Sequence, residues 1–231
     1  MQIRLLALLS LTSALSAQSR RVDSLPQRVD TTPSRAAASS APLVYAKRGL
    51  PARRIGAGTR AYGDATAPAA ITLLAPLDHV AQTTVDRPTL SWVYDPWVLP
   101  WAGTTMWLVV QDGAQRDSLR IDRPSAGVVR AQVPRRLTAG RTYEWTVRIT
   151  STADPSRVVD ASAALRLVAG PPVTTGTAEA RARSSAARGL WYDAFDVLWN
   201  SPDIETQRAL LTFVRETIGI DALPRPGTPN G

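Results

Sequence analysis

The chain has 231 residues, no cysteine and a formal net charge of +8. Without cysteine, a disulfide framework, a thiolate metal site and a cysteine nucleophile are all excluded. The basic excess lies mainly in residues 18–60, which carry nine Arg and Lys against two Asp, whereas residues 61–231 carry 17 basic and 17 acidic side chains. A folded nucleic-acid-binding domain concentrates positive charge on its own surface. Because the charges of residues 61–231 cancel, we expect no nucleic-acid partner.

Residues 1–17 have the pattern of a secretory signal peptide. Arg4 and the free amine precede an apolar stretch from Leu5 to Leu15, and small residues follow at Ser16 and Ala17. The apolar stretch is shorter than the roughly 20 residues that a membrane-spanning helix needs. We therefore expect cleavage near Ala17 and an exported protein, periplasmic or extracellular, with no transmembrane segment in the mature chain.

Residues 18–68 are rich in Ser, Ala, Pro, Arg and Gly and show no sustained apolar period. This composition predicts a disordered basic arm or linker. Two roles stay open for it: a solvated linker kept soluble by arginine, or a contact with anionic polymers of the cell envelope.

Residues 69–169 show the alternating pattern of β-strands. Tyr143, Trp145, Val147 and Ile149 share one face of a predicted strand that follows the turn at Gly140. A tyrosine that opens such a strand resembles the tyrosine corner of immunoglobulin-like and fibronectin type III sandwiches. Strands are predicted at residues 70–75, 89–95, 104–111, 117–121, 127–133, 141–151 and 158–168, with 104–111 central and a tight turn at Asp112 and Gly113.

The predicted sandwich is followed by a linker at residues 170–176, a helical hairpin segment at 177–220 and a disordered tail at 221–231. Thr175 or Thr177 is expected to cap a helix that ends before Gly189. A second helix carries an apolar stripe of Trp191, Ala194, Phe195 and Leu198. The third helix is expected to begin with Ser201 as its cap and Pro202 at its first position, and to bury Ile204, Leu211, Val214 and Ile218.

Few residues offer catalytic chemistry. His79 is the single histidine and is expected to lie in a surface loop, since the adjacent Asp78 seldom aims at its neighbour and no nucleophile elbow occurs. Asp193 and Asp196 are three residues apart and are expected on a solvated helix face. We predict no catalytic residue, no metal site and no cofactor.

Aromatic residues are the candidate contacts and the candidate core. Trp97 and Trp101 lie in a proline-stiffened loop after Tyr94, where the three rings are positioned to contact a protein partner or a glycan. The alternative is that this loop folds back over the end of the sandwich. The structural core is predicted to contain Trp92, Tyr143, Trp145 and Trp191.

Several segments, taken in order, resemble the bacterial family called domain of unknown function 928. The similarity runs from about Lys47 to Ile220, with one departure at Ala153, where relatives often have cysteine. The resemblance implies an exported or envelope protein and transfers no catalytic residue. The segments that carry it are residues 48–54, 74–94, 141–149, 153–168 and 189–198, the last of which also resembles the turn between the two helices of a tetratricopeptide repeat.

Together these patterns predict a mainly β protein: an immunoglobulin-like antiparallel β-sandwich followed by a short C-terminal segment of two to three helices. The expected function is a non-catalytic interaction or structural module of the cell envelope whose partner is an envelope protein. One alternative is a module that binds cell-wall glycan or peptidoglycan through Trp97 and Trp101. A second alternative is an uncharacterised hydrolase, which requires His79 or a carboxylate pair.

Overall fold

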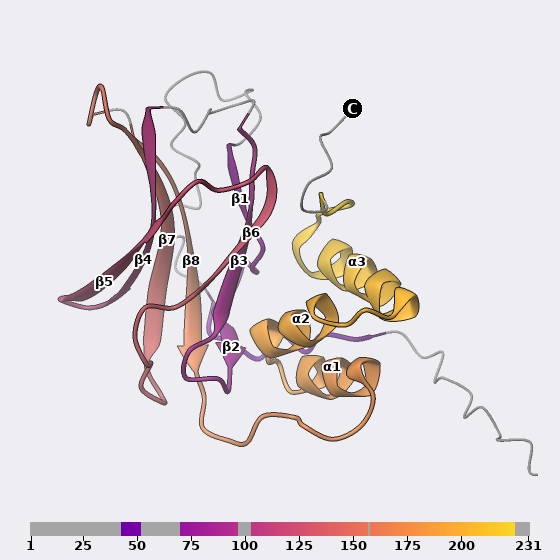
Figure 1. Ribbon diagram of the computed structural model, residues 1–231. Coiled ribbons are helices and arrows are strands. Elements are labelled where there is room, and N and C mark those ends of the chain that lie inside the picture. The colour runs from indigo at the N-terminus through magenta and orange to yellow at the C-terminus, as the bar shows by residue number, and fades with distance from the viewer. Residues whose placement is uncertain (1–42, 52–69, 97–102, 157, 225–231) are drawn as a thin grey trace, which may run out of the picture. The chain divides into compact units, whose positions relative to one another are not determined.

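The computed structural model describes residues 43–51, 70–96, 103–156 and 158–224 (Figure 1). Within this part of the chain, eight strands precede three helices. The strands are β1 (Ile71–Leu73), β2 (Ala81–Thr83), β3 (Thr89–Tyr94), β4 (Thr104–Asp112), β5 (Gln115–Ile121), β6 (Gly127–Gln132), β7 (Thr142–Ser151) and β8 (Val158–Leu167), and the helices are α1 (Ala178–Ala187), α2 (Trp191–Trp199) and α3 (Ile204–Ile218).

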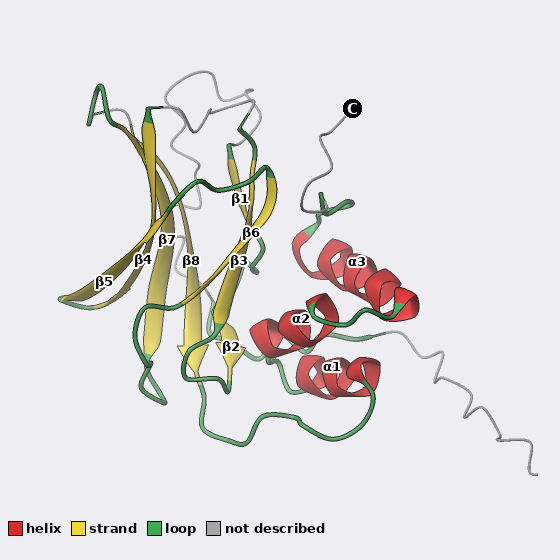
Figure 2. Ribbon diagram, in the orientation of Figure 1, coloured by secondary structure: helices red, strands yellow, loops and turns green. Residues whose placement is uncertain are grey.

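The strands form two sheets, and the fold is a β-sandwich with C-terminal helices (Figure 2). One sheet has the order β1-β3-β6, and the other has the order β2-β8-β7-β4-β5. All neighbours are antiparallel except β2 and β8, which are parallel. β4 therefore lies inside its sheet, and a two-residue turn after Asp112 joins it to β5.

All seven predicted strands are present, and the prediction missed β2. This strand has only three residues, Ala-Gln-Thr, which is too short to display a period. Its pairing partner, β8, lies more than 80 residues further along the chain, so no hairpin signal marks β2 either. It joins the larger sheet next to the point where the helices pack.

The four aromatic residues predicted for the core are buried. Trp92, Trp145 and Trp191 have no exposed surface and Tyr143 is 1% exposed. The hydroxyl of Tyr143 accepts a hydrogen bond from the backbone N–H of Thr138 at 2.8 Å, so the ring ties the turn before β7 to the core. This is the hydrogen bond that a tyrosine corner makes.

Replacing Tyr143 with phenylalanine is expected to lower the free energy of unfolding by about 1–2 kcal/mol, because the Thr138 N–H loses its acceptor. Urea denaturation checks this. The control is Thr138→Ala, which keeps the backbone donor and should change stability less. Equal losses in the two variants would show that the hydroxyl contributes nothing through this bond.

The helix boundaries follow the predicted capping residues at α1 but not at α3. Thr177 caps α1 by accepting a hydrogen bond from the Ala180 N–H at 3.2 Å. The cap of α3 is Asp203, which accepts from the Thr206 N–H at 2.9 Å, so the prediction of Ser201 as cap and Pro202 inside the helix was wrong. Aspartate is a strong cap because its carboxylate also interacts favourably with the helix dipole.

The buried face of α3 also differs from the prediction. Ile204 is 63% exposed and Leu211 is 43% exposed, whereas Val214 is buried and Ile218 is partly buried against the core. The helix buries Thr206, Leu210, Phe213 and Val214 instead. Leu210 and Leu211 are adjacent, so apolarity alone could not assign the face, and the aromatic ring of Phe213 decides it by packing against Trp191 at 5.7 Å between ring centroids.

Residues 43–51, which we call the strap, are ordered and packed, so the predicted disorder of residues 18–68 was wrong for this part. Leu43 is buried in the core. The Ala46 N–H donates to Ala186 O at the end of α1, and the Val80 N–H donates to Leu50 O beside β2. Residues 18–42 and 52–69 lie outside the described residues.

At the C-terminal end of the chain, Leu223 of the predicted tail packs against the core. Residues 225–231 are not described.

The sandwich and the helices share one hydrophobic core. α2 packs against β2 and β3, and the indole N–H of Trp145 in β7 donates to the hydroxyl of Tyr192 in α2 at 2.9 Å. On the same helix, Asp196 forms an ion pair with Arg130 of β6, whose guanidinium lies over the ring of Trp199. The helices are therefore part of the folded domain. No helix in the described ranges is long and apolar enough to cross a membrane.

Candidate functional site

A pocket of about 380 Å³ lies where β1, β8 and the C-terminal end of α3 meet. Its volume falls within the range of small-molecule and side-chain binding sites. The lining is mainly apolar, with hydroxyls from Thr72, Ser162 and Thr217 and the carboxyl of Asp78. The apolar lining residues are Ile71, Leu73, Ala75, Leu77, Ala161, Ile218 and Ile220.

The sequence prediction missed this pocket because its walls come from three separate parts of the chain, residues 71–78, 161–162 and 217–220. One local signal exists. β8 contains a run of four small residues, 161–164, in a strand that is otherwise rich in larger apolar side chains. Small side chains beside a strand edge leave space that a neighbouring element must fill or that stays open. At Ala161 and Ser162, that space belongs to the pocket.

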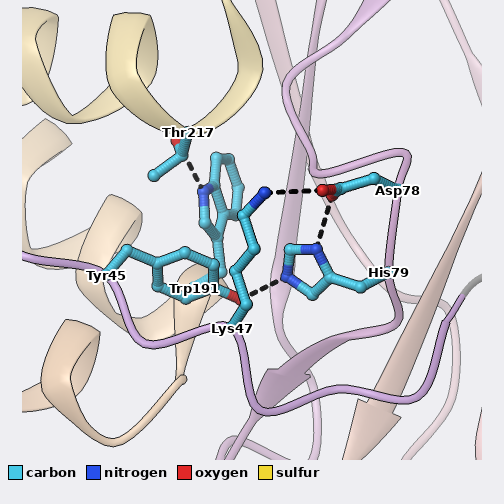
Figure 3. A network of polar contacts seen from close by, with 6 residues as sticks. All are labelled: Tyr45, Lys47, Asp78, His79, Trp191 and Thr217. Atoms are coloured by element: carbon cyan, nitrogen blue, oxygen red, sulfur yellow. Dashed lines mark hydrogen bonds and ion pairs between the residues drawn. The ribbon is translucent and has the colours of Figure 1, made fainter.

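A polar network joins the strap to the loop before β2, and Asp78 belongs to both the network and the pocket (Figure 3). His79 Nδ1 contacts Asp78 Oδ1 at 2.6 Å, and His79 Nε2 contacts the Tyr45 hydroxyl at 2.7 Å. Lys47 Nζ donates to the other Asp78 oxygen at 2.6 Å. His79 is thus held from both sides, and the strap supplies Tyr45 to the ring and Lys47 to Asp78.

His79 was expected in a surface loop, and that expectation was wrong. The residue is 4% exposed. Burial of the ring became favourable because both ring nitrogens find partners, one from the adjacent Asp78 and one from the strap 34 residues earlier. The partner in the strap could not be inferred from sequence, since the strap itself had been assigned to a disordered arm.

The proton positions in this network follow from the pKa shifts of its neighbours. The hydrogen bond from Lys47, together with the contact to His79, lowers the pKa of Asp78, so this carboxylate is ionised and can only accept. Burial and the charge of Asp78 raise the pKa of Tyr45, so its hydroxyl keeps its proton. In the neutral ring, Nδ1 therefore donates to Asp78 and Nε2 accepts from Tyr45.

This arrangement suits a structural junction better than a general base. A histidine acts as a general base either toward substrate, through a free nitrogen, or toward a reactive hydroxyl beside it. The hydroxyl here is that of Tyr45, whose raised pKa keeps it protonated. Both nitrogens of His79 contact protein groups. The network fixes the strap beside Asp78 and, through the edge-on packing of Tyr45 against Phe213 at 6.1 Å, beside α3. The network therefore shapes one rim of the pocket.

Asp193 was expected on a solvated helix face together with Asp196, and this was wrong for Asp193, whereas the side chain of Asp196 is 44% exposed. Asp193 is 8% exposed and accepts from the Thr83 hydroxyl at 2.5 Å, the Thr84 hydroxyl at 2.5 Å and the Thr84 N–H at 3.0 Å. Asp196 pairs with Arg130. Both carboxylates line a second pocket of about 220 Å³. Because Asp193 is held by three donors from the end of β2, its clearest role is to attach α2 to the sandwich.

Burial raises the pKa of Asp193 above its ordinary value of 3.8, so folding shifts this group toward its neutral form relative to the unfolded chain. The stability that this group contributes is greatest below pH 3.8 and declines as the pH rises and the unfolded chain ionises. Asparagine cannot ionise. Relative to wild type, an Asp193→Asn variant should therefore gain stability as the pH rises from 3 to 7. Urea denaturation at both pH values measures this, and a pH-independent difference would contradict it.

The chain matches the family model described as Domain of Unknown Function (DUF928) over residues 55–213, which is more than half of its length. The chain belongs to this family. A search of curated proteins finds no match to it.

The DUF928 match ends inside α3 and begins after the strap. The folded unit extends beyond both limits, because Leu43 and Tyr45 in the strap and Val214 and Ile218 in α3 pack in or against the core. Residues 189–198, which carry part of the family resemblance, form α2 and its preceding turn. The resembling segment 141–149 spans most of β7 and supplies Tyr143 and Trp145.

Of the three aromatic residues predicted as partner contacts in this DUF928 member, the structure describes only Tyr94. Trp97 and Trp101 lie outside the described residues. Tyr94 is 1% exposed at the end of β3, so its assignment as a contact was wrong. Its position in the alternating strand, two residues after Trp92, directs the ring into the core.

Proposed function

We propose that this protein is an exported, non-catalytic interaction module of the cell envelope that binds an envelope protein at the pocket between β1, β8 and α3. The pocket is the observation on which this rests. It combines apolar walls with a few hydroxyls and one carboxyl, the composition expected of a recognition site. The occupied ring nitrogens of His79 and the three donors around Asp193 favour binding over catalysis at these two groups.

Export is supported by the signal-like pattern of residues 1–17. The expected mature protein lacks these residues. Mass spectrometry of the protein from fractionated native cells tests this. A cytoplasmic protein that retains Met1 to Ala17 would contradict the proposal.

We also propose that the sandwich is immunoglobulin-like. Three features support this: the division into β1-β3-β6 and β2-β8-β7-β4-β5, the parallel β2–β8 pair, and the bond between Tyr143 and the Thr138 backbone. The helices after it are proposed to resemble one tetratricopeptide unit and the start of another. The short turn at Gly189 between α1 and α2 supports this assignment.

Photocrosslinking in the native cell tests the binding site. A photoreactive residue placed at Thr72, which lines the pocket, should yield a crosslinked adduct of defined mass. The same residue at Ser118, an exposed position on β5, is the matched control and should not yield that adduct. Adding Leu77→Trp, which fills the pocket, should remove it. The same adduct from both positions, or none from Thr72, would contradict the proposed site.

The glycan-binding alternative remains a proposal that depends on Trp97 and Trp101. Rigid indoles stack on sugar rings at low entropic cost, which is its physical support. A pull-down on cell-wall material with Trp97→Ala and Trp101→Ala tests it. Unchanged retention of both variants would remove this alternative.

A further inference from the structure

One edge of β8 is only partly paired within the described residues. β8 pairs with β7 without interruption from Val158↔Thr150 to Arg166↔Thr142. On its other side it pairs with β2 only at residues 165–167. The remainder of that edge therefore carries backbone donors and acceptors that no described strand meets.

The hydrogen bonds at the end of β8 show which residues face this edge. Leu167 directs both of its backbone groups toward β7, because its N–H donates to Arg141 O and its carbonyl accepts from the Gly140 N–H. The Val168 N–H instead donates to Thr83 O on the β2 side at 2.9 Å. Backbone groups alternate in direction along a strand, and the register has no bulge. Asp160 and Ser162 therefore direct their N–H and C=O groups toward the open edge, as does the N–H of Ala164, whose carbonyl lies at the start of the pairing with β2.

The pocket lies beside this edge. Ala161 and Ser162 line it from β8, and all three residues of β1 line it from the opposite sheet. β1 lies close to β8 but pairs only with β3 among the described strands, so the pocket lies between two strands that are not hydrogen-bonded to each other. A ligand here would meet a row of backbone hydrogen-bonding groups and an apolar recess together.

An extended peptide matches both features. Its backbone supplies acceptors and donors at the spacing of the β8 edge, and every second side chain points the same way, so one of them can enter the recess. β2 already uses the same edge at residues 165–167, and an added strand would continue this pairing toward Val158. A small apolar ligand would leave the backbone groups unpaired.

We propose that an extended segment of a partner protein adds to β8 as a strand alongside residues 160–164 and inserts an apolar side chain into the pocket. This inference rests on the proposed function and specifies how the same site binds. Specificity would come from the inserted side chain, and much of the affinity from the backbone.

Selection from a random heptapeptide library displayed on phage, with the full chain as target, supplies the probes. The recovered peptides should alternate apolar and polar residues. Ser162→Pro removes the N–H that faces the edge without removing a bond to β7, and should weaken their binding about tenfold or more. Ser162→Ala is the matched control. It removes the bond between the Ser162 and Thr146 hydroxyls, keeps the N–H, and should bind within about twofold of wild type.

A second measurement leaves the protein unchanged. A recovered peptide is N-methylated on alternate residues, once in each of the two registers. Only one set of peptide N–H groups faces β8 in a strand pair, so one methylated peptide should lose binding and the other should retain it.

The outcomes separate this inference from the function on which it rests. Equal binding of both methylated peptides, with Ser162→Pro binding as wild type, would overturn the strand pairing. If Thr72→Trp still abolished binding in that case, the pocket itself would stand. Failure to recover any peptide sensitive to either Ser162→Pro or Thr72→Trp would overturn both the strand pairing and the pocket as the binding site.

Discussion

Replacing Gly49 with alanine is expected to release the strap and lower the free energy of unfolding by about 3 kcal/mol, a large effect for a single methyl group. A Cβ at this position would lie 1.9 Å from the carbonyl oxygen of Val80 and 2.8 Å from its carbonyl carbon. These are backbone atoms of the segment leading into β2, so they cannot turn aside as a side chain would. The strap must move away.

Movement of the strap breaks contacts at both of its ends. The bond from the Val80 N–H to Leu50 O at 2.8 Å is lost, and the Tyr45 hydroxyl is drawn from His79. His79 then has a buried ring nitrogen without its partner, which is costly. Gly189 is a second position of close approach, since a Cβ there would lie 2.9 Å from Ala46 O and from Arg48 Cβ. The strap therefore packs closely at two places, where its own Gly49 meets Val80 and where Gly189 meets Ala46 and Arg48.

Urea denaturation and limited trypsin digestion measure the effect of Gly49→Ala. Trypsin should cut after Lys47 or Arg48 much faster in the variant than in wild type. Gly113→Ala is the control, because it adds a methyl group in open space and costs only the strain of a left-handed backbone, about 1 kcal/mol. Equal stability losses and unchanged digestion would mean that the strap is not packed against β2.

Replacing Asp193 with alanine is expected to be as damaging, lowering the free energy of unfolding by about 3–4 kcal/mol. The substitution leaves the Thr83 hydroxyl, the Thr84 hydroxyl and the Thr84 N–H without their acceptor. These groups lie at the end of β2 against α2, where Thr83 has no exposed surface and Thr84 is partly exposed. The helix would lose its polar attachment to the sandwich while its apolar contacts remain.

Asp196→Ala is the matched control for Asp193→Ala, because it removes the same side chain three residues further along α2. Its ion pair with Arg130 is partly exposed, with 44% of the Asp196 side chain accessible, so the loss should be about 1 kcal/mol. Urea denaturation compares the two variants. An equal loss of unfolding free energy in the two variants would mean that the buried hydrogen bonds of Asp193 stabilise the attachment of α2 no more than the exposed ion pair does.

The sandwich could be predicted because its strands are long enough to show their period. Tyr143, Trp145, Val147 and Ile149 alternate with polar residues in β7, and the same rule places Trp92 in the core. β2 could not be predicted because three residues carry no period. The face of α3 was misassigned because Leu210 and Leu211 are adjacent and only the packing of Phe213 distinguishes them.

The candidate site was harder to predict than the fold, because its residues meet only through tertiary structure. The burial of His79 depends on Tyr45 in the strap, and the burial of Asp193 depends on two threonines more than 100 residues earlier. The composition of the strap predicted disorder because its sequence shows no apolar period of a helix or a strand. Its order comes instead from close approach at Gly49 and from one buried leucine, Leu43.

Amide hydrogen exchange along β8 tests the central claim most directly, which is that the sandwich presents an unpaired strand edge beside the pocket. In the free protein, the N–H groups of Asp160 and Ser162 should exchange much faster than those of Ala161 and Ala163, which face β7. A bound peptide should slow Asp160 and Ser162 selectively. Slow exchange of all four amides in the free protein would mean that the edge is already occupied, and would contradict the account.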